Sequence, residues 1–211
     1  MKKAAVIGAG ASGLMAAYAA AKNGNQVTVF EKNEKAGKKI YITGKGRCNV
    51  TNDTSAEGFL ENVVRNAKFL KGCAYAFPPE KTMRFLEEGG LPLKVERGNR
   101  VFPVTDHAID VTKTLERSCR DAGAEIRLNE KVLSVGQENG AVRTVQTAKG
   151  IYECDAVIVA TGGLSYPSTG ATGDGYRFAQ ESGHSIIPTV PSLVGIELAE
   201  DVAPAQGISL K

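Results

Sequence analysis

Two short apolar runs near the N-terminus flank an alanine-rich segment. Residues 3–8 (KAAVIG) and 26–31 (QVTVFE) are predicted strands, and residues 11–23 between them are a predicted helix with small side chains that suit close packing on a sheet. Gly24 and Asn25 give that helix its usual stop. Two parallel strands joined by a crossover helix form a β-α-β unit.

The middle of the chain shows a change from a long loop to helical periodicity. Residues 32–52 are rich in glycine and lysine, and a loop of this length inside a compact domain is typical of a functional segment. The pattern then predicts helices over 57–71, 79–89 and 107–122, and a hairpin over 91–104 that turns at Gly98 and Asn99. The apolar positions at helical spacing are Phe59, Leu60, Val63, Val64 and Ala67 in the first helix and Ala108, Val111, Leu115 and Cys119 in the third.

Short alternating runs dominate the next stretch. We expect an antiparallel meander over 125–154, with Asn139-Gly140 as one of its turns, and then a buried parallel strand over 156–160. A second glycine-rich loop leads into a short helix at about 174–183. The proline-punctuated tail is predicted to be extended.

Composition narrows the class of protein. The 211 residues are 42% hydrophobic and 23% charged, an ordinary mix for a folded, water-soluble domain. The formal net charge of +3 is small and its cations are scattered, so a nucleic-acid partner is not expected. No apolar run reaches membrane-spanning length without glycine or charge, and we expect a cytoplasmic protein with reduced thiols. Four dispersed cysteines and two histidines do not suggest a metal site.

A glycine motif joins the first predicted strand to the first helix. Gly8, Gly10 and Gly13 form G-x-G-x-x-G, in which the glycines permit a tight turn, close approach of a pyrophosphate and close packing of helix on strand. Free amides at the helix start would hold the phosphate oxygens. Glu31 follows Gly13 by 18 residues, at the end of the second strand, where a carboxylate can accept hydrogen bonds from ribose hydroxyls. This pattern predicts an adenine dinucleotide site that disfavours NADP.

An export signal is the alternative interpretation of the same stretch. Lys2 and Lys3, an apolar run and alanines in A-x-A order are typical of a secretory signal. The three glycines break the run where a signal would be helical, and a strand ending in an acidic residue follows. The spacing favours the dinucleotide site.

The first β-α-β unit does not separate NAD from FAD, because both contain an ADP half. A plain NAD domain would repeat the unit directly, whereas here a basic loop, helices and a meander come first. This order resembles the glutathione-reductase type of FAD-binding fold. The expected class is therefore α/β, a Rossmann-like FAD-binding domain with a parallel sheet and an antiparallel β-meander.

Three segments carry a more specific resemblance. Residues 42–52 (ITGKGRCNVTN), 160–176 (ATGGLSYPSTGATGDGY) and 190–198 (VPSLVGIEL) resemble the BaiN/YhiN-like bacterial flavoproteins, a group that includes the aminoacetone oxidase family and NAD(P)/FAD-dependent oxidoreductases. Lys45 departs from the glycine run that is common in this group. The resemblance implies FAD as cofactor, a small organic substrate, and NAD(P)H as a possible electron donor; it leaves the oligomeric state open.

The resemblance also implies a set of cofactor contacts. The pyrophosphate would contact Gly8, Gly10, Ala11, Ser12 and Gly13, and the adenosine ribose would contact Glu31 and Lys32. The path toward the flavin would be lined by Lys39, Gly46, Arg47 and Asn49. Val132 would lie beside the adenine, and Ala160, Thr161 and Gly162 would close over the dinucleotide.

Several assignments stay open at this level. Asp174 is either close to the cofactor or the N-cap of the next helix, Cys48 is more readily a packed thiol than a nucleophile, and no catalytic residue is identified. Residues 1–190 are expected to form the FAD-binding domain, and 191–211 the truncated start of an inserted substrate-side domain. The leading function is an FAD-dependent oxidoreductase; a NAD-linked dehydrogenase domain and a non-catalytic, RNA-associated flavin-binding protein are the alternatives.

Overall fold

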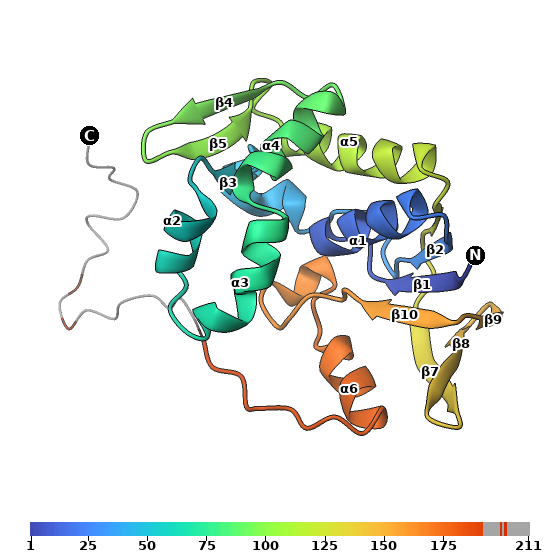
Figure 1. Ribbon diagram of the computed structural model, residues 1–211. Coiled ribbons are helices and arrows are strands. Elements are labelled where there is room, and N and C mark those ends of the chain that lie inside the picture. The colour runs from blue at the N-terminus through green and yellow to red at the C-terminus, as the bar shows by residue number, and fades with distance from the viewer. Residues whose placement is uncertain (192–198, 200, 202–211) are drawn as a thin grey trace.

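A four-stranded parallel sheet lies at the centre of the fold. The computed structural model describes residues 1–191, 199 and 201. Strand β1 (Lys3–Ile7), helix α1 (Ala11–Lys22) and strand β2 (Gln26–Phe30) form the predicted β-α-β unit, in which β1 pairs in parallel with β2. The sheet order is β10-β1-β2-β6 (Figure 1). The N-terminal stretch is thus a folded strand, helix and strand, and the alternative of a signal helix is wrong for it.

The two edge strands of this sheet come from distant parts of the sequence. Strand β6 (Glu125–Arg127) pairs in parallel with β2, and β10 (Ala156–Val159) pairs in parallel with β1. The sequence placed residues 125–127 in the meander, which is wrong, because they extend the parallel sheet instead. Strand β10 is parallel as predicted, but it is not buried: Val159 is 45% exposed.

The antiparallel meander is the three-stranded sheet β7-β8-β9. It consists of β7 (Val132–Glu138), β8 (Ala141–Thr147) and β9 (Gly150–Glu153), and the turn between the first two falls at the predicted Asn139-Gly140 pair. It therefore begins seven residues later than the sequence pattern suggested.

The chain between β2 and β6 forms short elements around a second antiparallel sheet of order β3-β5-β4. The predicted hairpin is present and turns at Gly98 and Asn99, both with positive φ. The predicted third helix is α5, whose Ala108, Val111, Leu115 and Cys119 are buried as expected. The elements are η1 (Ile40–Gly46), β3 (Thr51–Asn52), α2 (Ala56–Glu61), α3 (Ala67–Ala76), α4 (Pro79–Glu88), β4 (Leu93–Glu96), β5 (Arg100–Pro103) and α5 (Ala108–Asp121).

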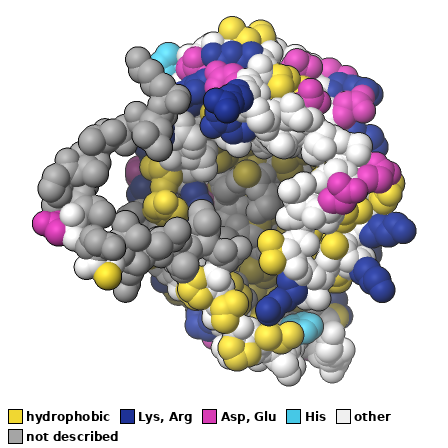
Figure 2. Space-filling view, turned by 90° about the vertical axis from the view of Figure 1, so that its left-hand side faces the viewer, with side chains coloured by type: hydrophobic (Ala, Val, Ile, Leu, Met, Phe, Trp, Pro, Cys, Tyr) yellow, Lys and Arg dark blue, Asp and Glu magenta, His cyan; other side chains and the backbone are white. Residues whose placement is uncertain are grey.

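The single helix expected over residues 57–71 is wrong. The chain leaves the α conformation after Glu61, and Asn66, which precedes α3, adopts the left-handed region with φ 61°. Val64, counted among the apolar positions of one helical face, is 98% exposed in this break. Figure 2 views the side of the molecule that carries α2 and α3 and shows exposed hydrophobic side chains next to a hollow.

The central sheet is covered on both faces. Alternate residues of β1 point to opposite sides, so that Val6 packs with α1 and α5, while Ala5 and Ile7 pack toward the meander. Phe30 and Phe178 also belong to the meander side, the latter from α6 (Asp174–Glu181), which follows the one-turn helix η2 (Pro167–Thr169). This two-sided packing fixes the strand ends that build the site.

Candidate functional site

A cavity of about 370 Å³ opens beyond the carboxyl ends of β1, β2 and β10. Open α/β sheets bind ligands at this edge. Most of the site residues implied by the sequence line the cavity. They are Gly8, Gly10, Ala11, Ser12, Glu31, Lys32, Lys39, Val132, Ala160, Thr161 and Gly162.

The three motif glycines have separate structural roles. Gly8 has φ +103°, and a Cβ there would lie 2.5 Å from the carbonyl oxygen of Ala160. A Cβ on Gly13 would lie 1.9 Å from the carbonyl oxygen of Gly8, so this position allows α1 to approach β1. A Cβ on Gly10 would meet nothing within 4 Å, which leaves open space beside the cavity.

The N-terminus of α1 faces this open space. Gly10 is the N-cap and supplies no side-chain cap, and the first turn contains no acidic residue. The first amides of a helix have no partner inside the helix and carry a partial positive charge. A diphosphate group therefore fits the turn, since it meets free donors and the first turn of the helix carries no carboxylate.

Glu31 is buried at the end of β2 and turns its carboxylate to the glycine loop. Its Oε2 accepts a hydrogen bond from Ala9 N at 2.8 Å, and its Oε1 accepts from the backbone N and the Nδ2 of Asn33 at 2.8 and 2.7 Å. A carboxylate has about four acceptor positions, so about one position is left for a ligand hydroxyl. The carboxylate thus supports the glycine turn and faces the cavity at once.

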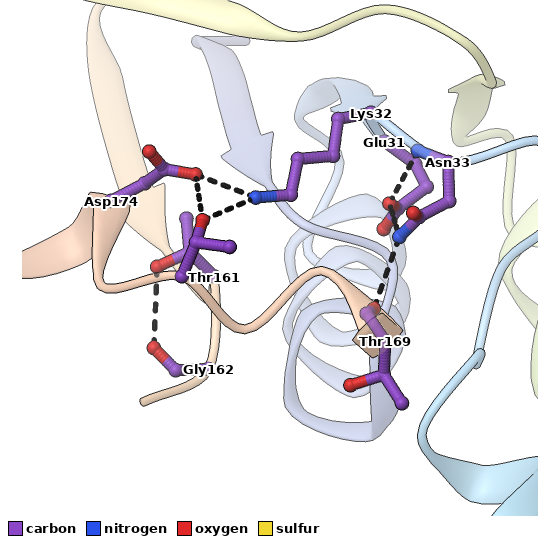
Figure 3. Close-up of polar contacts among 8 residues, drawn as sticks. Glu31, Lys32, Asn33, Thr161, Gly162, Thr169 and Asp174 are labelled. Atoms are coloured by element: carbon purple, nitrogen blue, oxygen red, sulfur yellow. Dashed lines mark hydrogen bonds and ion pairs between the residues drawn. The ribbon is translucent and has the colours of Figure 1, made fainter. Parts of the chain in front are cut away.

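Four hydrogen bonds tie the segment after β10 to the loop after β2, and Figure 3 draws those made by Lys32 and Asn33. Lys32 Nζ lies 2.7 Å from Asp174 Oδ2 and 2.8 Å from Thr172 Oγ1. Asn33 Nδ2 donates to the carbonyl oxygen of Thr169 at 3.2 Å. Lys39 Nζ donates to the carbonyl oxygen of Ser165 at 2.8 Å. Segments more than 120 residues apart therefore form opposite walls of one cavity.

Asp174 belongs to the cavity wall. The N-cap of α6 is Gly173, and Asp174 is the first helical residue, so the N-cap alternative is wrong. Burial acts to raise the pKa of Asp174, but the hydrogen bond and the charge of Lys32 outweigh it, and the pKa is lowered. The carboxylate is charged at neutral pH and holds Lys32.

Four of the implied residues do not line the cavity: Gly13, Gly46, Arg47 and Asn49. Asn49, with its amide oriented to satisfy both groups, donates to the carbonyl oxygens of Thr51 and Val101. Arg47 Nε lies 2.8 Å from Asp106 Oδ1, its Nη2 pairs with Glu96, and its guanidinium lies 4.2 Å from the centre of the Phe102 ring. Arg47 therefore fastens the loop after η1 to the β4–β5 hairpin.

The charge cluster around Arg47 has a testable pH dependence. The Arg47 hydrogen bond lowers the pKa of Glu96 below its ordinary 4.5, and Lys94, followed by Arg47, lowers the pKa of Asp106 below its ordinary 3.8. Groups with a depressed folded pKa stabilise the fold above their unfolded pKa and lose this contribution as pH falls through the folded value.

We expect Arg47→Ala to lower Tm at pH 7, and the difference from the parent chain to shrink as pH falls below about 4.5, measured by thermal melts followed by circular dichroism. Arg84→Ala removes an exposed ion pair to Glu80 within one helix and is the matched control, with little change expected. A Tm difference that stays constant down to pH 3 would contradict the assignment.

Cys48 has the properties of a packed thiol. It is 5% exposed, and burial raises the pKa of its thiol, opposed by a hydrogen bond with Thr43. A raised pKa disfavours the nucleophilic thiolate. The four cysteines are free, and three of them are buried.

Sequence reasoning missed part of the cavity wall. Asn33, Lys38, Lys131 and Thr169 line it and were not singled out. Lys131 follows Glu130, which is 4% exposed and accepts hydrogen bonds from Tyr152 at 2.6 Å and Thr147 at 2.9 Å. Glu130 needs these partners because a buried carboxylate is costly without hydrogen bonds.

The described residues contain no helix long and apolar enough to cross a membrane. Within the same residues, no group of three or more histidine, cysteine, aspartate or glutamate side chains is placed to hold a metal ion. The domain division at residue 190 lies at the limit of the described residues and stays a prediction.

Comparison with protein families places this cavity in a known group. Residues 2–210 match the family described as the HI0933-like protein Rossmann domain. The chain belongs to this family. The members of this family are FAD-dependent oxidoreductases, and the cofactor of the family is FAD. The match confirms the predicted Rossmann-like FAD-binding fold. It also confirms the family resemblance that was drawn from the three sequence segments.

Two curated relatives are similar along nearly the whole chain. The 3-dehydro-bile acid delta(4,6)-reductase of Clostridium scindens is 33% identical over 99% of this chain and 51% of its own length. A ribosomal RNA dihydrouridine synthase of Haemophilus influenzae is 34% identical over 97% of this chain and 52% of its own length. The chain therefore spans about half the length of the curated relatives it matches.

Solved structures share the fold. A flavocytochrome c3 fumarate reductase in an open conformation has a TM-score of 0.66 at 24% identity and covers 87% of this chain and 41% of its own. Mycobacterium smegmatis Sdh1 in complex with UQ1 has a TM-score of 0.64 at 21% identity and covers 86% of this chain and 39% of its own.

The expectation that nucleic acid is not a partner gains no support, because one of the relatives above is named for ribosomal RNA.

Proposed function

We propose that this chain is the FAD-binding part of an oxidoreductase in which two electrons pass between NAD(P)H or a small organic substrate and an acceptor. The observation that carries the proposal is the cavity at the strand ends, where free helix amides, a buried carboxylate and four lysine side chains converge. FAD, when bound, supplies the hydride-transfer chemistry. The reductase name of one relative favours the reductive direction.

In this proposal the protein binds and orients the cofactor. The amides of Gly10, Ala11 and Ser12 donate to the diphosphate, and the free acceptor position of Glu31 takes a ribose hydroxyl. Lys39 adds positive charge near the same phosphates while its Nζ is held on Ser165. Val132 packs from the start of the meander, and Ala160 to Gly162 close the opposite side.

Reconstitution tests the cofactor and the redox direction separately. We expect the chain to bind added FAD, seen as an absorbance band at about 450 nm, weakly enough that part of it is lost on desalting, and to bind NAD more weakly still. Bleaching of that band when NADH or NADPH is added under anaerobic conditions, with no other reductant present, identifies the electron donor. Retention of FAD without bleaching would leave the cofactor site intact and remove NAD(P)H from the proposal. Failure to bind FAD would show that the proposed cofactor site is wrong.

A second candidate is a flavoenzyme that acts on RNA. Two relatives, at 34% and 30% identity, are named ribosomal RNA dihydrouridine synthase. The candidates differ in substrate class, and consumption of reduced cofactor in the presence of uridine-containing RNA, but not of free small-molecule acceptors, would favour the second.

A further inference from the structure

The segment over residues 62–79 concentrates the positive charge of the protein. It contains Arg65, Lys68 and Lys71 and no acidic residue. Its charge equals the formal net charge of the whole chain, +3, so the remaining residues balance to zero. The whole-chain value therefore hides a local excess of cations on and next to α3.

Helix α3 presents the two lysines together with aromatic rings. Lys68, Lys71 and Tyr75 share one face at helical spacings of three and four residues, and Gly72 between them leaves open space. Phe69, beside this face, is 84% exposed. Ala74, which is 6% exposed, lies on the adjoining side of the helix, which packs inward. Figure 2 shows hydrophobic side chains exposed on this side of the molecule.

The three cations have no partner in the part of the chain that the structure describes. Arg65, Lys68 and Lys71 make no hydrogen bond, ion pair or ring contact there, whereas Lys32, Arg47 and Lys94 are each held by carboxylates. The Tyr75 hydroxyl is hydrogen-bonded to Glu57 of α2, which raises its pKa and leaves the ring at the surface. The Glu57 carboxylate is thus engaged with Tyr75.

Unpaired cations beside exposed rings fit a polyanion that carries flat groups. Single-stranded RNA offers both, because its phosphates attract lysine and arginine and its bases stack on aromatic side chains. The cores of stable protein interfaces are by contrast depleted in lysine. We propose that α3 and the preceding turn, through Arg65, Lys68, Lys71 and Phe69, form a docking surface for single-stranded RNA. The surface goes beyond the redox proposal, which stands whether or not α3 binds RNA.

The test uses the FAD-loaded chain and a fluorescein-labelled single-stranded oligouridine, with affinity measured by anisotropy between about 50 and 200 mM salt. We expect Lys68→Gln/Lys71→Gln to weaken binding roughly tenfold or more and to reduce the slope of log affinity against log salt by about 1.4, since each phosphate contact on a single strand contributes about 0.7. Phe69→Ala should weaken binding about fivefold or more through lost stacking.

The matched control is Lys22→Gln/Lys113→Gln, which removes the same charge from exposed positions of α1 and α5 and should leave affinity within about twofold. Retention of FAD and unchanged circular dichroism show that each variant is folded. Equal loss in the α3 and control pairs would overturn the proposal, as would undetectable RNA binding. Binding to phosphatidylserine vesicles alone, or self-association that Phe69→Ala abolishes, would also overturn it and assign the surface to a membrane or to a second copy.

Discussion

Gly13→Ala is expected to destabilise the domain severely. The added Cβ would lie 1.9 Å from the carbonyl oxygen and 3.0 Å from the carbonyl carbon of Gly8, and both are backbone atoms that no side-chain rotation can move away. Helix α1 would have to shift from β1, which overpacks a buried interface at a cost of about 3 kcal/mol or more. For a chain of this size the loss corresponds to a fall in Tm of roughly 6 °C or more.

Thermal melts of the chain without added cofactor check this expectation, because they separate folding from binding. Gly123→Ala is a poor control, since Gly123 has φ +94°, but Gly72→Ala is a good one: it lies in a helix and its Cβ would meet nothing within 4 Å. Gly72→Ala should raise or preserve Tm. If Gly13→Ala has the same Tm as the parent chain, Gly13 does not approach the carbonyl group of Gly8 as closely as the structure shows.

Gly10→Ala is expected to have the opposite profile, with a stable fold and a damaged cofactor site. Gly10 has φ −78° and ψ −175°, a conformation that alanine adopts freely, and its Cβ would meet no protein atom within 4 Å. The cost to folding is below about 1 kcal/mol. The methyl group would stand where a diphosphate approaches the helix amides, so FAD affinity should fall roughly tenfold or more.

Isothermal titration with FAD, beside a melt of each chain, distinguishes the two glycine variants. Weaker FAD binding with an unchanged Tm is the expected result for Gly10→Ala. Unchanged FAD affinity would place the diphosphate elsewhere and remove the helix amides from the proposed site. Comparison with adenosine diphosphate, which lacks the flavin, shows whether the loss arises at the shared half of the cofactor.

The sequence could bring the glycine turn and Glu31 to one cavity because the determinants of this part of the fold are local. The glycine spacing and Glu31 lie within one β-α-β unit, where the spacing itself sets the geometry. The role of Arg47 was not accessible in this way. Its partners Glu96 and Asp106 are 49 and 59 residues away in the sequence, and their approach depends on how the hairpin packs.

The errors in secondary structure have a similar origin. Residues 62–66 keep an apolar spacing that fits a helix, and only the left-handed conformation of Asn66 shows where the chain turns. Strand β6 has three residues, too few for periodicity to choose between a hairpin partner and an edge of a parallel sheet. The contacts of Lys32, Asn33 and Lys39 with the loop after β10 likewise join segments that no local pattern connects.

Strand β10 has consequences for handling the chain on its own. It pairs with β1 along one side, and within the described residues no strand pairs with its other side. The strand reads AVIV and carries no charge or proline that would discourage a further strand from adding there. An uncharged, hydrophobic edge strand of this kind can pair with a strand of another molecule, which promotes aggregation at high concentration. Ala156→Lys, at the exposed amino end of β10 and away from the cavity at the carboxyl end of the strand, should improve solubility without disturbing the cofactor site.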